Sequence, residues 1–317
     1  MGIATALEAK KKKLTYLVVE QGTLVNSIYH FPANMRFFST AEKLEIDGIP
    51  FSSVHPKPTR KEGMEYFRKV AASNQLKINL FEKVLEVSRT NDFFKVETTK
   101  GKYSAKNVVV ATGFYGIPRM LDVPGESLPK VSHYYDDPHY YYDQDVIVVG
   151  ASNSACDAAL EIFRRGGRVT MIVRGESLGK RVKYWVRPDI ENRIKEGNIK
   201  AYFNASVTKI EQDHVEVRLG SGAIESLKND YVLALIGYRP HYEFLKELGV
   251  EISEDQRLLP RFDSQTMQTN QKGIYLAGVL CAGAETHKLL IENSLIHSKR
   301  IIKHIVATKQ TKELNGC

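Results

Sequence analysis

The clearest pattern of apolar and polar positions lies in the middle of the chain. Residues 146–149 form a short run of β-branched residues, which is typical of a buried strand. Apolar residues then follow at the spacing of one helix face: Ala155, Ala158, Ala159, Ile162 and Phe163. Gly166 and Gly167 predict the end of this helix, and residues 169–173 predict the next strand. The pattern therefore predicts a β-α-β unit.

A turn of small residues joins the first of these strands to the helix. It has the form Gly-x-Ser-x-x-Ala, where the usual dinucleotide-binding turn has Gly-x-Gly-x-x-Gly. Serine at the second position is compatible with a pyrophosphate only if the turn is open, whereas alanine at the third still allows close packing of helix on strand. We expect a pyrophosphate to bind at Gly150, Ser152, Asn153, Ser154 and Ala155. A β-α-β unit without a ligand is the alternative.

The residue at the end of the second strand discriminates between the two nicotinamide dinucleotides. An acidic residue there would bind a ribose 2′-hydroxyl, but this chain has Arg174, followed by Lys180 and Arg181. Cations at this position suit the 2′-phosphate of NADPH. A solvent-exposed basic loop with no ligand is the alternative interpretation.

The first twenty residues repeat the same order of elements. Ala155 and Arg174 are 19 positions apart, and Gly2 and Glu20 are 18 apart. A helix carrying Ile3, Ala6 and Leu7 and a strand at 14–19 are predicted between Gly2 and Glu20, which stands where an acid would bind a ribose diol. We interpret this segment as a nucleotide unit that begins at the last glycine of its own turn, with the preceding strand and two glycines absent. A plain helix and strand is the alternative.

Composition limits the class of protein. The chain of 317 residues is 43% hydrophobic and 26% charged, which is typical of a folded protein with two domains. It has no long apolar stretch and no secretion signal, so we expect a cytoplasmic protein. The net charge of +8 is scattered, which argues against nucleic acid as a partner. The three cysteines, Cys156, Cys281 and Cys317, are far apart and form neither a metal site nor a redox dithiol of the Cys-x-x-Cys kind.

Further segments resemble a known group of proteins. Strands followed by small-residue turns are predicted at 106–113 and 273–278, and Gly237-Tyr238 follows another strand. With the Glu20 strand and the Gly150–Ala155 unit, these segments resemble the flavoproteins that have two dinucleotide-binding domains. Within that group, the specific likeness to one family lies in the segments 26–32, 35–40, 42–45, 123–126 and 133–134. The chain resembles thioredoxin reductases in size and order, and especially the bacillithiol disulfide reductases among the pyridine nucleotide-disulphide oxidoreductases. The resemblance implies an α/β fold with two Rossmann-like domains, the first lacking its first strand.

The resemblance also implies cofactors and an arrangement of domains. FAD would bind a discontinuous domain of residues 1–120 and 262–317, and NADPH would bind an inserted domain of residues 121–261. Hydride would pass from NADPH to FAD, and electrons would then reach a low-molecular-weight disulfide. Glu20 would bind the ribose of FAD, the Val84 backbone would meet the adenine, and Phe37–Thr40 would lie beside the flavin. Besides Phe37, Ser39 and Thr40, the residues expected to contact a cofactor are Gly2, Ala111, Thr112, Gly113, Gly237, Gly278 and Val279. The family also implies a homodimer.

Two departures from these families concern the thiols. Thioredoxin reductases have Cys-x-x-Cys shortly before the NADPH turn, but residues 132–144 contain no cysteine. The cysteine that the bacillithiol disulfide reductases often have in the first glycine turn is replaced by Met1. Cys281 is the one candidate for a catalytic thiol, with a packing role as its alternative, and Cys156 is expected to be structural. Val279 stands where the flavin turn usually has an aspartate.

Two other functions stay open at this stage. A flavin monooxygenase-like enzyme also fits, because residues 34–50 and 58–60 resemble that group and such enzymes need no protein thiol. A protein that binds NADPH without FAD is the third possibility, since it follows from the absent first strand.

Overall fold

The computed structural model describes residues 1–91 and 93–314. The chain divides into two compact units. Unit 1 contains Met1–His30, Met35–Ile117 and the chain from Arg239 onward, and unit 2 contains Phe31–Asn34 and Pro118–Tyr238. Residues 239–261, which the sequence analysis places in the inserted domain, thus belong to unit 1. The reason is burial, because Leu245 and Val250 pack in the same apolar cluster as Tyr275 and Ile301.

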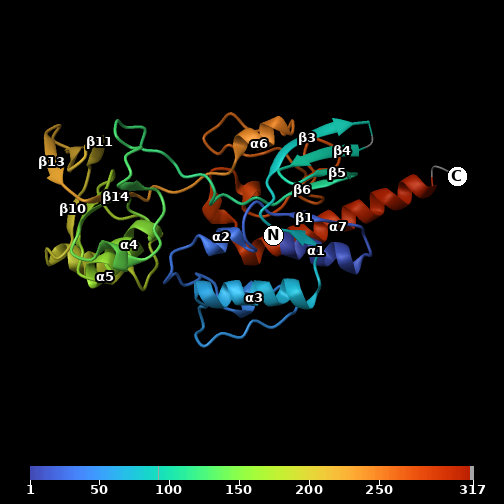
Figure 1. The fold of residues 1–317 in the computed structure, drawn as a ribbon, viewed down its shortest axis with the longest axis horizontal. Helices are drawn as coiled ribbons and strands as arrows, with labels where there is room; N and C mark the ends of the chain where they lie inside the picture. The colour runs from blue at the N-terminus through green and yellow to red at the C-terminus, as the bar shows by residue number, and fades with distance from the viewer. Residues whose placement is uncertain (92, 315–317) are drawn as a thin grey trace. The chain divides into compact units, whose positions relative to one another are not determined.

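Unit 2 is built on a parallel sheet with the α/β character expected from the sequence (Figure 1). The strand order is β10 (Lys200–Tyr202), β9 (Arg168–Ile172), β8 (Asp145–Val149), β14 (Tyr231–Ala234) and β7 (Val131–Ser132). Helices α4 (Asn153–Arg164) and α5 (Arg187–Lys195) and the 3₁₀ helix η2 (Pro138–Tyr141) complete this part. A separate antiparallel sheet contains β11 (Ser206–Ile210), β12 (His214–Arg218) and β13 (Ile224–Lys228).

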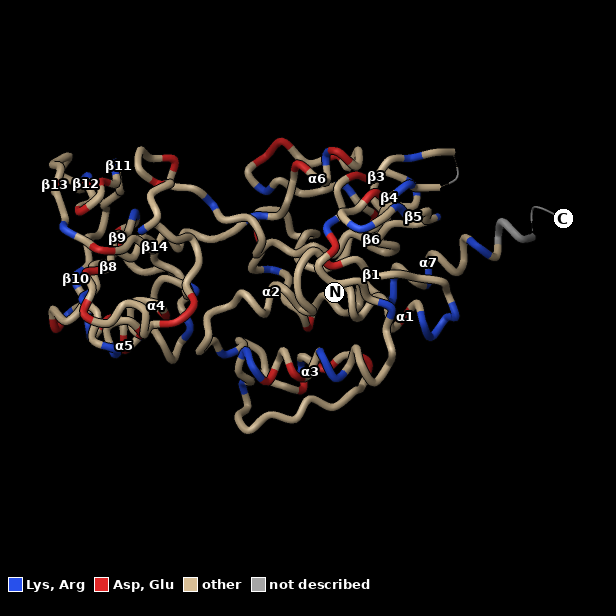
Figure 2. Tube along the Cα trace, viewed as in Figure 1, with Lys and Arg blue, Asp and Glu red and all other residues tan. Residues whose placement is uncertain are grey.

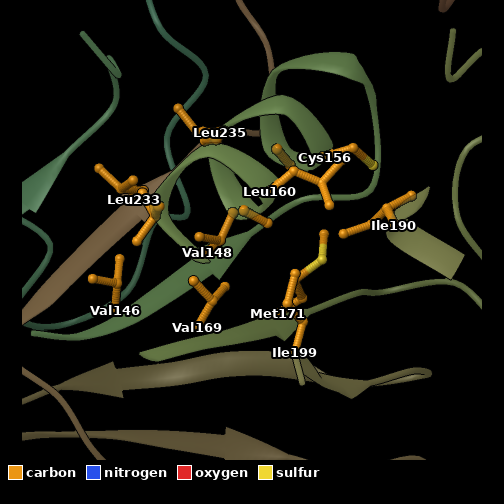
Figure 3. Close-up of a cluster of buried hydrophobic side chains, with 14 of the residues drawn as sticks. Val146, Val148, Cys156, Leu160, Val169, Met171, Ile190, Ile199, Leu233 and Leu235 are labelled. Carbon is orange, nitrogen blue, oxygen red and sulfur yellow. The ribbon is translucent and has the colours of Figure 1, made fainter. Parts of the chain in front are cut away.

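The apolar face predicted for the central helix is the buried face of α4. Ala155, Ala158, Ala159 and Ile162 are all fully buried. In Figure 3, Cys156 and Leu160 of α4 lie in one cluster with strand residues of the sheet and with Ile190 of α5. The labelled strand and loop residues of that cluster are Val146, Val148, Val169, Met171, Ile199, Leu233 and Leu235. Burial of this face fixes the start of α4 against the end of β8.

Unit 1 contains two pairs of parallel strands and one antiparallel sheet. β1 (Val18–Val19) pairs with β2 (Ile78–Asn79), and β6 (Val108–Val110) pairs with β15 (Ile274–Leu276). β3 (Val84–Thr90), β4 (Phe93–Thr98) and β5 (Lys102–Ala105) form the antiparallel sheet. Among the residues that the structure describes, β1 and β15 each have one strand neighbour. The strand expected at 14–19 is shorter than predicted and begins at Val18.

The helices of unit 1 pack around these strands. The long ones are α1 (Gly2–Lys11), α3 (Arg60–Ser73) and α7 (Ile291–Leu314), and the short ones are α2 (Asn26–Tyr29) and α6 (Tyr242–Glu247). Three 3₁₀ turns are η1 (Glu42–Leu44), η3 (Val279–Ala282) and η4 (Thr286–Lys288). α1 packs against α7, and the hydroxyls of Thr5 and Ser298 share a buried hydrogen bond of 3.0 Å. In the described parts of the chain, none of the helices has the length and apolar character that crossing a membrane requires.

α3 buries Tyr66, Phe67 and Val70, carries basic and acidic residues along its length (Figure 2), and begins with a complete N-terminal cap. The Thr59 hydroxyl accepts a hydrogen bond from the Glu62 backbone N–H at 3.3 Å, and the Glu62 carboxylate accepts the Thr59 backbone N–H at 2.8 Å. This reciprocal pair is a capping box. The hydrogen bonds that the Glu62 carboxylate accepts, above all the one from the Thr59 backbone, lower the pKa of Glu62 to about 2.

We expect the unfolding free energy of Glu62→Gln to decrease less at acidic pH than that of the wild type. A carboxylate whose pKa is lowered by folding stabilises the folded state above its unfolded pKa, and this stabilisation disappears as the pH falls from about 4.5 to about 2. At pH 7 the variant should lose on the order of 1 kcal/mol of unfolding free energy, the usual contribution of a cap. Denaturant unfolding at pH 7 and pH 3 measures both effects. Glu65→Gln, on the exposed face of α3, is the control and should change little.

Candidate nucleotide-binding sites in the two units

The turn that follows β8 has a backbone that only glycine adopts without strain. Gly150 has a φ of +137°, and a Cβ at this position would lie 2.6 Å from the carbonyl oxygen of Leu235. Leu235 follows β14, and its N–H donates to the Val149 carbonyl at 2.9 Å. The turn therefore fits closely between β8 and β14, at the carboxyl ends of adjacent parallel strands, where dinucleotides bind in this type of sheet.

The first turn of α4 faces this glycine. Ser152 is the N-cap residue, and its side chain makes no capping hydrogen bond. The first backbone N–H groups of a helix have no acceptor within the helix, so they suit an anion. Ser152 and Ser154 are exposed, whereas Ala155 is fully buried against the sheet. The structure thus places these residues at the start of α4 beside the Gly150 turn.

Three cations lie near this turn without a counter-charge. Arg174, Lys180 and Arg181 are exposed, and in the described part of the chain no ion pair involves them. The neighbouring cations are already neutralised, because Lys183 pairs with Asp157 at 2.7 Å and Arg187 pairs with Glu191 at 2.7 Å. The positive charge of the loop is thus concentrated on the three residues that the sequence analysis selects.

Backbone contacts bring the basic loop of residues 174–183 beside the glycine turn. The Gly179 N–H donates to the Ala151 carbonyl at 2.8 Å, and a Cβ on Gly179 would lie 3.0 Å from that oxygen. Asn153 contacts the loop with both atoms of its amide. Sequence reasoning missed these contacts and the Asp157–Lys183 pair. The one available signal was the spacing of Asn153 and Asp157, which puts both on one face of α4.

Gly237 lies beyond the strand that neighbours the Gly150 turn. It follows β14, is exposed and has a φ of +98°. Its carbonyl accepts the Arg119 N–H at 2.9 Å, which holds the segment in place. The structure therefore groups Gly237 with Gly150, because β8 and β14 are neighbours.

In unit 1, two expected turns lie together at the carboxyl ends of β6 and β15. Residues 111–113 follow β6, and Gly278 and Val279 follow β15. The Ala277 N–H donates to the Val110 carbonyl at 2.9 Å, so the two turns are adjacent. Gly113 and Gly278 have φ values of +72° and +86°, in the region that favours glycine. The structure thus brings the Ala111-Thr112-Gly113 turn and the Gly278-Val279 turn together.

The start of α1 lies beside both this pair of turns and β1. The Met1 side chain contacts Gly278, where a Cβ would lie 2.6 Å from Met1 Cγ, and Gly2 packs toward Val18. Glu20 follows β1, and its carboxylate accepts the Gly22 N–H at 3.1 Å. Burial raises the pKa of Glu20, while the hydrogen bond from Gly22 opposes this shift. A partly buried carboxylate at the end of β1 has the position expected for a ribose ligand.

The residues expected beside a flavin ring differ from one another in burial and in their contacts. Phe37 is buried and packs over Gly63 of α3, where a Cβ would lie 2.5 Å from Phe37 Cε2. Ser39 is buried and donates to the Glu292 carboxylate at the start of α7, whereas Thr40 is half-buried. Val84 is half-buried at the start of β3. Glu292 is a further polar residue of this region that sequence reasoning did not select.

Cys281 lies in a buried environment that does not activate a thiol. Its Sγ is 3.9 Å from His297 Nδ1, and the same nitrogen accepts the Gly278 N–H at 3.1 Å. Burial raises the pKa of Cys281 to about 12 and, together with the charge of Arg300, lowers the pKa of His297. Both groups are therefore neutral near pH 7, and the pair is not a thiolate–imidazolium couple. Burial likewise raises the pKa of Cys156 to about 12.

Comparison with known proteins agrees with this architecture. The family model of pyridine nucleotide-disulphide oxidoreductases matches residues 1–278. The chain belongs to this family. It is 40% identical over 305 residues to the bacilliredoxin reductase Bdr of Bacillus subtilis, covering 96% of this chain and 94% of that protein. The family assignment confirms that the protein is an oxidoreductase with the fold expected from the sequence.

Two solved structures are similar over nearly their whole length. The bacillithiol disulfide reductase Bdr of Staphylococcus aureus has a TM-score of 0.94 and 39% identity, covering 97% of this chain and 95% of that one. The enzyme of the same name from Bacillus cereus has a TM-score of 0.94 and 38% identity, covering 96% and 95%. These likenesses extend to both units of the chain.

Proposed function

We propose that this protein is an NADPH-dependent FAD oxidoreductase that reduces a low-molecular-weight disulfide of the bacillithiol type. The observation that carries this proposal is the group of three exposed cations beside the Gly150 turn, Arg174, Lys180 and Arg181, which form no ion pair with the residues that the structure describes. Membership of the pyridine nucleotide-disulphide oxidoreductases and the similarity to bacillithiol disulfide reductases support the reaction. We further propose that it works in the cytoplasm as a homodimer, as the family likeness suggests.

The residues of unit 2 fit NADPH. The N–H groups at the start of α4 would donate hydrogen bonds to the pyrophosphate, because a helix N-terminus replaces part of its lost hydration. Arg174, with Lys180 and Arg181, would bind the 2′-phosphate through charge-assisted hydrogen bonds. Gly150 leaves the space beside the backbone that a pyrophosphate needs.

The residues of unit 1 fit part of an FAD site. Glu20 would accept hydrogen bonds from the ribose hydroxyls, and the turns at 111–113 and 278–279 would leave room for the close approach of a ligand. Gly2, at the start of α1, would lie at the pyrophosphate. When bound, FAD supplies the electron carrier between a nicotinamide and a disulfide.

The nature of the electron acceptor that we propose is based on the cysteines of the chain. The sequence has no Cys-x-x-Cys, and Cys281 and Cys156 are buried with raised pKa values. Among the cysteines that the structure describes, no activated dithiol supports a relay to a protein substrate. A small disulfide that itself reaches the electron donor fits these observations.

The test of the proposed function has two parts. The purified protein, supplied with FAD, should show the two-banded visible spectrum of a bound flavin. It should then oxidise NADPH, and NADH far more slowly, in step with the reduction of bacillithiol disulfide. Consumption of oxygen matched to hydroxylation of a substrate would instead favour a monooxygenase. NADPH binding without any flavin spectrum would favour a protein that does not use FAD.

We expect Cys281→Ser to keep the turnover of the wild-type enzyme within about twofold, because a thiol whose pKa is about 12 contributes little thiolate at pH 7. Cys156→Ser is the matched control, since it changes a second buried thiol with the same pKa direction. Steady-state rates with NADPH and disulfide measure both. Loss of turnover in Cys281→Ser alone, with NADPH oxidation by an artificial acceptor intact, would make Cys281 the catalytic thiol.

A further inference from the structure

The side-chain amide of Asn153 connects two parts of unit 2 that are distant in the sequence. Its Nδ2 donates to the Arg181 carbonyl at 3.1 Å, and its Oδ1 accepts the Lys183 N–H at 2.8 Å. Asn153 is the first residue of α4, so both bonds start from the glycine turn and end in the basic loop. An asparagine is suited to this task, since its amide carries both a donor and an acceptor.

The rest of the structure around these bonds supports a role in positioning. Asp157, one helical turn after Asn153, pairs with Lys183 at 2.7 Å, and both side chains are largely buried. Arg187 donates to the Gly179 carbonyl at 2.6 Å, and the Gly179 N–H donates to Ala151. Of these contacts, the one from Asn153 Nδ2 holds the backbone of Arg181 itself, and the one to Asn153 Oδ1 holds that of Lys183.

We propose that Asn153 is a positioning residue that sets the selectivity for NADPH by holding Lys180 and Arg181 at the 2′-phosphate. This inference rests on the proposed function, and it differs from direct binding of the cofactor by Asn153. Two expected effects distinguish a positioning role of Asn153 from direct binding of the cofactor. A residue that binds the pyrophosphate contributes equally to NADPH and NADH, whereas one that holds the basic loop contributes to NADPH alone. Its effect also requires that the cations of the loop are present.

The experiment compares Asn153→Ala with Asn198→Ala, a control that removes an exposed asparagine of unit 2 with one side-chain hydrogen bond to Glu196. Calorimetry with adenosine 2′,5′-bisphosphate and with 5′-AMP measures binding without turnover. Asn153→Ala should weaken the bisphosphate roughly fivefold or more, the effect of losing two ordinary hydrogen bonds, and leave 5′-AMP unchanged. Asn198→Ala should change neither.

A double variant completes the test. In an Arg181→Ala, Lys180→Ala background, Asn153→Ala should have little further effect on the bisphosphate, because the cations that it holds are gone. Equal losses for both ligands, or an undiminished effect in this background, would overturn the inference in favour of direct binding. A wild-type protein that binds the two ligands equally would instead contradict the proposed preference for NADPH. Thermal unfolding of each variant checks that unit 2 is folded.

Discussion

Arg174→Ala is expected to raise the KM for NADPH roughly tenfold or more and to leave the KM for NADH nearly unchanged. The guanidinium stands at the end of β9, is exposed and has no ion pair in the described residues, so its charge is available to a phosphate. A charge-assisted hydrogen bond contributes about 1.5 to 3 kcal/mol, and 1.4 kcal/mol corresponds to about tenfold in affinity. NADH has no 2′-phosphate, which is why its binding does not depend on this residue.

Steady-state kinetics with both nucleotides measure this prediction. Lys228→Ala is the control, because Lys228 is an exposed cation of unit 2 on β13, outside the basic loop. The contribution of Arg174 should also decrease as the salt concentration rises, since salt screens an exposed charge. Equal increases in KM for both nucleotides would show that Arg174 has a structural role instead.

Gly150→Ala is expected to weaken the binding of both NADPH and NADH at least tenfold and to destabilise unit 2. An alanine there would have a φ of +137°, and its Cβ would lie 2.6 Å from the Leu235 oxygen. Backbone strain of this kind costs of order 1–3 kcal/mol, and a forced contact in a packed region costs about 1–3 kcal/mol more. The turn must therefore move, and the N–H groups that we propose to bind the pyrophosphate move with it.

Gly197→Ala separates the two contributions. Gly197 also has a positive φ, +75°, but nothing lies within 4 Å of the position of its Cβ. This control should lose about 1–2 kcal/mol from backbone strain alone and bind both nucleotides normally. Denaturant unfolding and nucleotide titration measure the pair. A Gly150→Ala protein that matches Gly197→Ala in stability and in nucleotide binding would show that the turn tolerates a side chain.

The two predictions test different parts of one site. In the proposed site, the glycine turn would bind the part that NADPH and NADH share, whereas Arg174 would bind the 2′-phosphate that distinguishes them. Gly150→Ala should thus change both nucleotides, and Arg174→Ala only one. Titration of both variants with each nucleotide measures this contrast in the absence of an electron acceptor.

The sequence by itself determined the elements whose signals are local. The β-α-β unit from β8 to β9 follows from a β-branched run and from a repeat of apolar residues at helical spacing, and its buried face in α4 is the one predicted. The positions of Gly150 after the first strand and of Arg174 after the second strand follow from the same sequence pattern. The absence of Cys-x-x-Cys needs no structure at all.

Only the tertiary structure decided the features that join distant residues. The amide of Asn153 forms hydrogen bonds with residues 181 and 183, Phe37 packs over Gly63, and Cys281 lies against His297. Residues 239–261 pack in unit 1 because Leu245 and Val250 find their apolar neighbours there. Such contacts have no period along the chain, and the free energy of a buried thiol or a paired amide depends on which groups surround it after folding.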